Sequence, residues 1–550
     1  MLRQIASLRA LDVVMVSGVT WILLKIIRTT RRRLRSTPIR GPPNPSFVFG
    51  AGQVLLKAED PGAVYEKWVA EYGLVFKVPS ALGKSRIVLF DPKAISHFYT
   101  KETYTYVPTT LSRNLTEMVA GRGLFWAQGD SHKRQRKQLT PAFSNAAIRN
   151  HTAVFYDSAY KAKTSWDTIL DSSENSTIEV QGWLDTIGIT GFSHNFGALD
   201  GKRSTVADVF ESFGNATPSP LAIAFFLLAP FFPWLVKLPT ARIRLAHKLK
   251  ASMGEISQEL LARTRQEKEG NAEGEQEDKS IIGLLSKSRS YDNAFPAATD
   301  THLVQMRVLL LAGYESTSIS LTVGVFHNNA TLPFSHAFGF GQWALIRLSQ
   351  NLDMQDKLRE ELTQFSNTDP SWDQMNSSLP YLNAVVHEVL RLHPPVQETT
   401  RIAAEDDIIP LSDPIRTASG NYVDYISIAK GTLVSIPMRA INRSEVFWGA
   451  DAKEFKPERW LDEAGITGRA KELQGHRHLL TFVDGPRMCL GKGFALAEIK
   501  AVLSVLIKNF AFELPDGPDT KIELARGVLP RPKIAGEEGY RVPLKVRRMN

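Results

Sequence analysis

Cysteine is almost missing from this sequence, because Cys489 is the single thiol among 550 residues. An intrachain disulfide is therefore impossible, which fits a reducing compartment and leaves the thiol for chemistry or for core packing. In other respects the composition is that of a folded globular protein, with 43% hydrophobic and 22% charged residues. No break in composition follows residue 47, so residues 48–550 are predicted to form one large unit.

Acidic side chains are scarce in residues 1–40, which contain nine basic residues and one acid. This segment therefore accounts for +8 of the formal net charge of +9, and the rest of the chain is close to neutral. Because the positive charge is confined to one terminus, it does not make a nucleic-acid-binding surface. That class of function is excluded.

The N-terminal segment also contains a long apolar run. Residues 11–27 are almost entirely apolar and reach the short limit for crossing a bilayer. The dense basic residues that follow predict a transmembrane anchor whose C-terminal side faces the cytoplasm. A cleaved signal peptide is the alternative, but it would carry its basic residues first and end in small residues. We expect a tail over residues 1–10, the anchor helix over 11–27, and a basic, proline-rich hinge over 28–47.

The body of the chain is predicted to be mainly helical. Residues 48–110 alternate between helical and strand-like patterns, with a buried strand at 86–90, and residues 130–290 are mostly helical. An apolar stretch at 221–236 is broken by prolines, which favours a rim that dips into a membrane surface over a second span. Residues 265–280 are charged and predict a solvated loop. Long helices are expected over residues 303–322 and 381–393.

The residues around Cys489 are of the types that a metal-bound thiolate needs. Gly485 and Gly491 allow a tight turn and a close approach of the backbone to a flat ring. The helix expected after the loop supplies N–H groups and positive potential, Arg487 can pair with an acid group, and Phe482 can cover the sulfur. A buried structural cysteine is the alternative for any single thiol. The chemical interpretation requires a strand before the loop and a helix after it.

Residues 482–491 match the cytochrome P450 haem-binding signature F-x-x-G-x-R-x-C-x-G at every fixed position, so the chain resembles that family. The resemblance implies that Cys489 is the sulfur ligand of the iron of haem b, an iron protoporphyrin IX. It also implies a mainly α fold with a small β region, the cytochrome P450 fold, as a single large haem domain behind the N-terminal transmembrane anchor. In that domain the loop residues that bind haem would be Phe482, Gly485, Arg487 and Gly491.

Two further motifs resemble elements of the same family. Glu388 and Arg391 form an E-x-x-R on the 381–393 helix, where they share one face, and Arg459 lies in a Pro-Glu-Arg-Trp sequence that is similar to P-E-R-F. The resemblance implies that Glu388, Arg391 and Arg459 form a buried structural network behind the haem. Trp460 stands where the family commonly has Phe.

The centre of the 303–322 helix resembles the oxygen-activation motif A-G-x-[DE]-T. A hydroxyl group in a locally opened helix can hold water beside bound oxygen, and a neighbouring acid can relay protons. Glu315, Ser316 and Thr317 are therefore the expected catalytic residues, and either hydroxyl can be the working one. Hydroxyl groups bonded back to helix carbonyls are the structural alternative.

His132 and Arg136 are expected on a helix that is similar to the family's W-x-x-x-R element, whose Trp and Arg bind a haem propionate. His132 takes the place of the Trp. A solvated basic face is the alternative interpretation of this stretch. If the resemblance holds, the lysines and arginines nearby would present positive charge to an acidic reductase.

Residues 323–342 contain no charged side chain and interrupt the predicted oxygen-activation helix, and the family pattern has no such insertion there. Their removal restores the helical periodicity of apolar residues. A retained intron of twenty codons is the hypothesis that fits, since Val and Gln codons can carry the usual intron ends.

The resemblance implies a monooxygenase that inserts one atom of O2 into a hydrophobic small molecule. Electrons would come from NADPH through NADPH-cytochrome P450 reductase, with cytochrome b5 as a second candidate donor, at the cytoplasmic side of the endoplasmic reticulum membrane. By analogy with fungal microsomal members, the substrate would be a terpenoid or polyketide of secondary metabolism. The alternatives are a haem-binding protein inactivated by residues 323–342, and an isomerase or dehydratase of the same fold.

Overall fold

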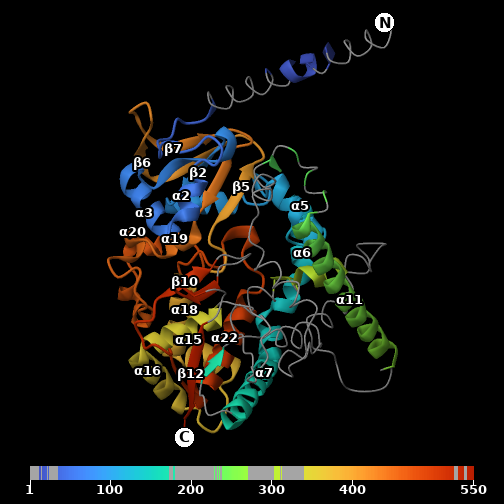
Figure 1. The fold of residues 1–550 in the computed structure, drawn as a ribbon, viewed down its shortest axis with the longest axis vertical. Helices are drawn as coiled ribbons and strands as arrows, with labels where there is room; N and C mark the ends of the chain where they lie inside the picture. Colours follow the sequence, from blue (N-terminus) through green and yellow to red (C-terminus); the bar gives the residue numbers. More distant parts are fainter. Residues whose placement is uncertain are drawn as a thin grey trace. The chain divides into compact units, whose positions relative to one another are not determined.

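The computed structural model describes residues 35–172, 177–179, 240–270, 303–309, 311–312, 340–525, 531–537 and 542–549, with a few positions in 12–23 and 228–238. The described chain forms two compact units, each of which is considered by itself. Unit 1 comprises residues 1–108 and 399–437, and unit 2 comprises residues 109–398 and 438–550. The content is mainly helical with a small β region, as predicted (Figure 1).

Unit 1 is built on a mixed five-stranded sheet with the order β1-β2-β8-β5-β3. Strands β2 and β8 pair in parallel, and the other neighbours pair in antiparallel. The predicted strand at 86–90 is β2, whose last residues are buried. The strands are β1 (Val75–Pro79), β2 (Ser85–Leu89), β3 (Tyr106–Val107), β5 (Thr399–Ala403) and β8 (Leu433–Ile436).

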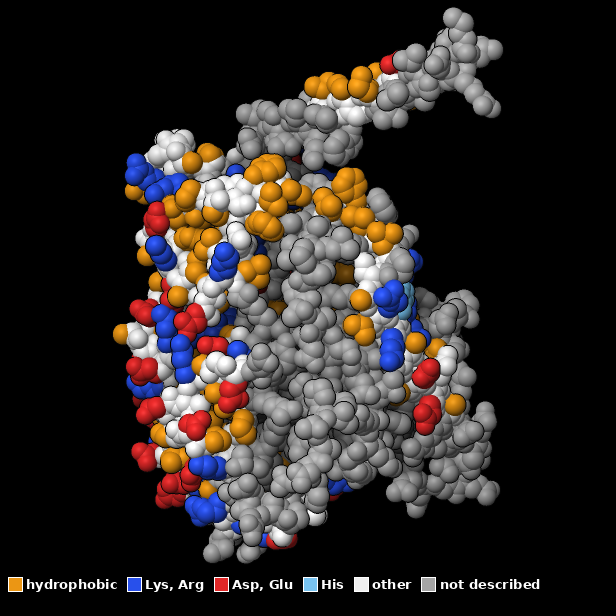
Figure 2. Space-filling model, viewed as in Figure 1, with side chains coloured by type: hydrophobic (Ala, Val, Ile, Leu, Met, Phe, Trp, Pro, Cys, Tyr) orange, Lys and Arg blue, Asp and Glu red, His pale blue; other side chains and the backbone are white. Residues whose placement is uncertain are grey.

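Helices and one long hairpin complete unit 1. Helices α3 (Pro61–Tyr72) and α4 (Pro92–Thr100) both begin with proline, and the carboxylates of Asp60 and Asp91 cap them by accepting backbone N–H groups. The hairpin consists of β6 (Asp407–Arg416) and β7 (Tyr422–Ile428). On the face of unit 1 in Figure 2, apolar side chains gather near the short helix α2 (Gly52–Lys57). The exposed apolar side chains within α2 and in the segment just before it are Phe47, Val48, Val54 and Leu56.

Residues 35–38 of the hinge lie along the β6–β7 hairpin and its flanks in unit 1. The Thr37 N–H donates to the Ser427 carbonyl at 3.1 Å, and the Ser427 N–H donates to Thr37 Oγ1 at 2.8 Å. The Ala418 N–H donates to the Pro38 carbonyl at 2.6 Å, and Arg35 pairs with Asp406 at 3.1 Å. Backbone donors thus fix this proline-rich stretch, although proline itself cannot donate.

The predicted membrane anchor lies largely outside the described residues. In the described part of the chain, no helix combines the length and the apolar character that a membrane crossing requires.

Unit 2 holds most of the helices. Helices α18 and α22 are buried on nearly every side and pack against each other and against α16. This burial explains why the sequences of α18 and α22 are largely apolar, since a helix that is hydrophobic on all sides is a buried helix. The predicted helix at 381–393 is α18. The helices of unit 2 are α5 (Thr110–Val119), α6 (Gly129–Leu139), α7 (Asn145–Ser172), α11 (Ala241–Gly270), α15 (Phe340–Gln350), α16 (Leu352–Thr363), α17 (Trp372–Ser377), α18 (Pro380–Leu392), α19 (Met438–Asn442), α20 (Glu445–Trp448), α21 (Gly468–Lys471) and α22 (Lys492–Asn509).

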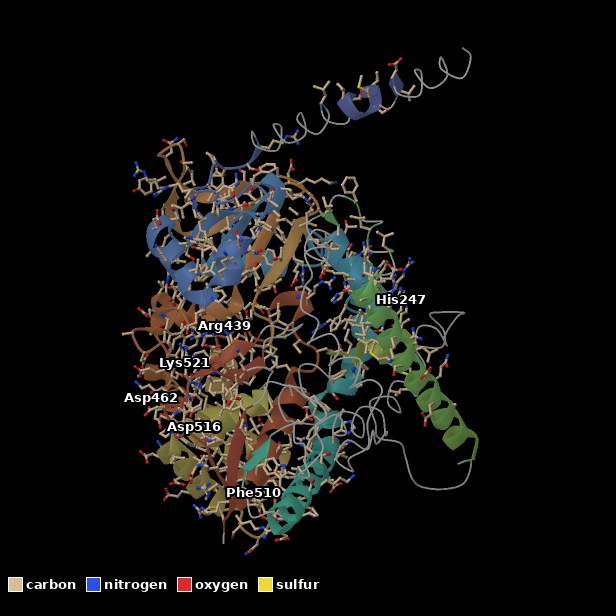
Figure 3. All side chains as sticks on the ribbon, viewed as in Figure 1. His247, Arg439, Asp462, Phe510, Asp516 and Lys521 are labelled. Carbon is tan, nitrogen blue, oxygen red and sulfur yellow. The ribbon has the colours of Figure 1, made fainter. Side chains whose placement is uncertain are left out.

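Two small sheets accompany the helices of unit 2. Phe510, labelled in Figure 3, follows α22 as its C-cap, begins β9 and packs its ring against Trp166 of α7 at 5.4 Å between centroids. One sheet has the order β4-β12-β9, and the other pairs β10 with β11. Their strands are β4 (Thr177–Glu179), β9 (Phe510–Glu513), β10 (Ile522–Ala525), β11 (Arg531–Ile534) and β12 (Pro543–Arg548).

Two local expectations differ from the structure. Residues 265–270 were expected in a loop, but they are the last residues of α11. Charged Glu, Lys and Arg residues are good helix formers, so a solvated stretch of them can extend a helix. The segment before the Cys489 loop contains an isolated bridge between His476 and Leu479 in place of a full strand.

Candidate active site

A buried ion network lies at the C-terminal end of α18. Glu388 and Arg391, both fully buried, form a bidentate pair with N–O distances of 2.7 and 2.8 Å. Arg459 lies 3.6 Å from the Glu388 carboxylate and pairs with Asp451 at 2.9 Å. The structure thus brings together Glu388, Arg391 and Arg459, the three residues that the sequence grouped. We call these residues, with Trp460, the closed network.

Two donors to Glu388 were not found from the sequence. The indole N–H of Trp460 donates to Glu388 Oε2 at 2.9 Å, and the Lys456 backbone N–H donates to Oε1 at 3.0 Å. The carboxylate is therefore surrounded by donors, as a buried charge requires. The signal for the first donor was the Trp in place of Phe, which adds one N–H group beside a buried acid.

Hydrogen bonds connect the closed network to the segment that leads into the cysteine loop. The Arg391 guanidinium donates to the carbonyl of Asn442 at 2.9 Å. The Asn442 side chain in turn accepts the Leu480 N–H at 3.1 Å and donates to Thr481 Oγ1 at 2.9 Å. Phe482 follows directly, so the network fixes the position from which the loop departs.

The Cys489 loop is closed by a backbone bond across its ends, in which the Cys489 N–H donates to the Phe482 carbonyl at 2.8 Å. Gly485 adopts φ +67°, a conformation that favours glycine, and a single 3-10 turn covers Gly485–Arg487. Helix α22 begins at Lys492 with Gly491 as its N-cap. The helix required after the cysteine is therefore present.

The Cys489 thiol is exposed, yet protein atoms surround it closely enough for desolvation to be the main influence on its pKa. Both observations hold for a thiol that is open on one side and enclosed on the others. Desolvation raises the pKa of the thiol above its ordinary value, whereas the Gly491 N–H and the charges of Arg136 and Lys492 act to lower it. The chain thus supplies the donors that favour a thiolate.

Helix α6 brings one cation, Arg136, and one histidine, His132, to the same place. Burial lowers the pKa of Arg136, and the nearby Cys489 acts in the opposite direction. Burial, followed by the charges of Arg487 and Arg136, lowers the pKa of His132 to about 4, so its imidazole is neutral at neutral pH. We call Cys489, Arg136, His132, Arg487 and Lys492 the open cluster. Arg487 also donates from Nη2 to the carbonyl of Ala127.

Other predicted site residues lie outside the described part of the chain. These are Glu315, Ser316 and Thr317, and the insertion at 323–342 lies outside it except for residues 340–342, which begin α15. The start of the predicted 303–322 helix is described: residues 303–309 and 311–312 are helical.

Comparison with known proteins decides the family. The cytochrome P450 family model matches residues 40–327 and 341–535. The chain belongs to the cytochrome P450 family. It is 57% identical over 538 residues to cytochrome P450 monooxygenase claQ of Ampulloclitocybe clavipes, with 96% of each chain covered. It is 56% identical over 554 residues to claP of the same fungus, with 99% of each covered, and 33% identical to cytochrome P450 monooxygenase 205 of Postia placenta, with 96% and 95% covered.

The protein is a cytochrome P450 monooxygenase, and the cofactor of the family is a haem whose iron takes a cysteine thiolate as axial ligand. The open cluster fits such a group. It offers one thiol, open on one side, and cations that match the negative propionate groups of a haem. A Cβ placed on Gly491 would meet no atom closer than 3.9 Å, so the backbone there is accessible as well.

Proposed function

We propose that Cys489 is the axial thiolate ligand of the haem iron in this P450, and that the enzyme inserts one atom of O2 into a hydrophobic small molecule. The observation that carries the proposal is the position of the only thiol of the chain, at the start of α22 with Arg136 and Lys492 as its electrostatic partners. A helix N-terminus and two cations favour the anionic sulfur that a haem iron requires.

The remaining residues of the loop and of α6 would hold the cofactor in place. Arg136 and Arg487 would pair with the propionates, and the neutral His132 would donate a hydrogen bond to one of them. Buried Phe482, whose carbonyl closes the loop, would keep water from the sulfur. Gly485 and Gly491 would permit the turn and the close approach to the ring.

Oxygen activation is assigned to Glu315, Ser316 and Thr317 on the motif alone. When bound, the haem iron supplies the oxygen-activating chemistry of the family, which thiolate ligation favours. The acid and one of the two hydroxyl groups would hold and relay protons on the distal side. Separate Ser316→Ala and Thr317→Ala variants identify the working hydroxyl, because its loss diverts NADPH consumption from product to peroxide.

The proposed partners and location rest on the family and on the N-terminal sequence. NADPH-cytochrome P450 reductase would deliver single electrons, with cytochrome b5 as a second donor, and the anchor at 11–27 would hold the enzyme on the cytoplasmic face of the endoplasmic reticulum. Relatives named cytochrome P450 monooxygenase claQ and claP, both from a fungus, support a fungal monooxygenase. A terpenoid or polyketide of secondary metabolism is the proposed substrate class.

The decisive test is Cys489→Ala in the full chain, with Met488→Ala as the neighbouring control. We expect the first variant to lose the thiolate-type carbon monoxide difference spectrum and all NADPH-dependent turnover, and the second to keep both. An unchanged spectrum and turnover in Cys489→Ala would refute the assignment.

A haem-binding but inactive protein is the second candidate, and one observation favours it. The family model matches no residue in 328–340, within the uncharged segment 323–342. The full chain and a variant without residues 323–342 should be expressed with a reductase. Turnover restored only in the shortened chain supports inactivation by the insertion, and product formed without NADPH supports an isomerase or dehydratase.

A further inference from the structure

The loop between α5 and α6, residues 120–128, is held by one buried side chain from the helical segment 303–312. Gln305, 2% exposed, accepts the backbone N–H of Leu124 through its Oε1 atom at 3.3 Å. Its Nε2 donates to Oε1 of Gln135 on α6 at 2.7 Å. One amide thus uses its acceptor on the loop and its donor on the helix that carries His132 and Arg136.

Close packing at the same place leaves the loop little freedom. A Cβ built on Gly123 would lie 2.5 Å from Val308 Cγ2 and 3.1 Å from Val304 Cγ1. A Cβ on Gly121 would lie 3.3 Å from Val304 Cγ1. Only glycine therefore allows the loop backbone to approach residues 303–312 this closely.

The other end of the loop is tied to the cysteine loop. The N–H groups of Trp126 and Ala127 both donate to the Gly123 carbonyl at 3.0 Å, which closes a turn. The Ala127 carbonyl accepts from Arg487, two residues before Cys489. The loop therefore bridges the helix predicted to activate oxygen and the loop predicted to hold the iron.

We propose that Gln305 is a positioning residue that sets the loop 120–128 against the oxygen-activation helix and thereby fixes the size of ligand that the distal side accepts. This inference rests on the proposed function. Without the Gln305 amide the buried Leu124 N–H has no acceptor, so the loop must move until water or another group satisfies it. The loop bearing Leu124 and the exposed Phe125 then no longer has one fixed position.

The test uses the full-length haem-loaded enzyme with Gln305→Leu, and Gln135→Glu as the matched control. The carboxylate that Gln135→Glu introduces still accepts the Gln305 N–H, so the control keeps the bond that Gln305→Leu removes. Two azoles that ligate iron serve as probes: imidazole, which touches little else, and clotrimazole, which is bulky. In Gln305→Leu we expect clotrimazole affinity to change about tenfold while imidazole affinity stays within about twofold of wild type.

Hydrogen exchange of the peptide that spans residues 120–128 gives a second readout. It should be faster in Gln305→Leu and unchanged in Gln135→Glu. If Gln305→Leu does not load haem, Gly123→Ala displaces the loop independently, and adding Val308→Ala should restore wild-type clotrimazole affinity by restoring room for the new methyl group.

Equal changes for both azoles, or unchanged exchange in Gln305→Leu, would overturn the positioning role. A failure of the proposed function has a different signature, because the wild-type enzyme would then lack the thiolate-type spectrum. Hydrogen exchange at the Leu124 amide tests the bond to Gln305 whether or not the proposed function holds.

Discussion

Two charged clusters in unit 2 differ in how their charges are balanced. In the closed network, Glu388 forms an ion pair with Arg391 at 2.7 Å and accepts two further hydrogen bonds, from the Lys456 backbone and the Trp460 indole. Arg459 forms an ion pair with Asp451 at 2.9 Å. In the open cluster, the influences on the pKa of Arg136 are burial and Cys489, with no carboxylate among them. In the first cluster the acids and arginines pair with one another, whereas in the second the printed electrostatic partner of Arg136 is the thiol of Cys489.

This difference separates a structural ion cluster from a cofactor site. A charge that is partly buried needs a partner, and the haem propionates proposed above would be partners for Arg136. We therefore expect substitutions in the closed network to lower the stability of the fold. Substitutions in the open cluster should lower cofactor affinity instead. The predictions below test this distinction.

Arg391→Leu should have the largest effect. It leaves the fully buried Glu388 carboxylate without its bidentate partner, so the free energy of unfolding should fall by about 3–5 kcal/mol. Chemical denaturation, monitored by circular dichroism, measures this free energy of unfolding. Arg469→Leu is the control, because Arg469 and Glu472 pair at the same sequence spacing but are partly exposed, and its loss should cost about 0–1 kcal/mol. Similar losses in the two variants would contradict the distinction.

Arg136→Ala should weaken haem binding by about 10- to 100-fold, because it removes a cation from the site of the proposed propionate contact. The haem-free protein should unfold at an unchanged or higher denaturant concentration, since the other cations lose a repelling neighbour. Haem transfer to apomyoglobin measures the affinity. Arg134→Ala, at an exposed position of the same helix, should leave both properties unchanged. Loss of stability without loss of haem affinity would place Arg136 in a structural role.

Trp460→Phe should lower the free energy of unfolding by about 1.5 kcal/mol, because the bond of 2.9 Å from its indole N–H to the Glu388 carboxylate disappears. Trp448→Phe is a close control, since the buried indole N–H of Trp448 has no hydrogen-bond partner among the described residues. Thermal unfolding measures the shift of the midpoint in each of the two variants. If both shift the midpoint equally, the Trp460 bond contributes nothing specific.

His387, next to Trp460 at 5.5 Å between ring centroids, gives the smallest effect. Burial lowers its pKa to about 3 in the folded chain. The unfolded chain therefore binds the proton more tightly, so stability is full above the ordinary value of 6.5 and is lost as pH falls toward the folded pKa. Between pH 7.5 and pH 6 the loss from this group is roughly 0.8 kcal/mol.

The slope of stability against pH over this range should be shallower in His387→Phe than in wild type. Urea titrations at several pH values measure it, and an identical slope in the two proteins would show that His387 does not contribute.

The sequence predicted the grouping of Glu388, Arg391 and Arg459 and the helix after Cys489, because these residues lie in short motifs. Glu388, Arg391 and Arg459 meet as expected, and α22 begins beside Cys489. The Lys456 N–H on Glu388 and the Gln305 amide on Leu124 could not be predicted, because each depends on segments brought together by tertiary packing. The end of α11 at Gly270 was missed for another reason, since a charged stretch is equally compatible with a loop and an exposed helix.

The docking of the hinge on the β6–β7 hairpin has a mechanical consequence. Hydrogen bonds and an ion pair attach residues 35–38 to the hairpin and its flanks, and two carboxylates attach the hairpin to the rest of unit 1, with Asp407 accepting from Lys101 at 2.6 Å and Asp91 from the Ser412 N–H at 2.9 Å. A force applied at Arg35 would therefore pass through the hairpin to both ends of α4, which Asp91 and Lys101 cap.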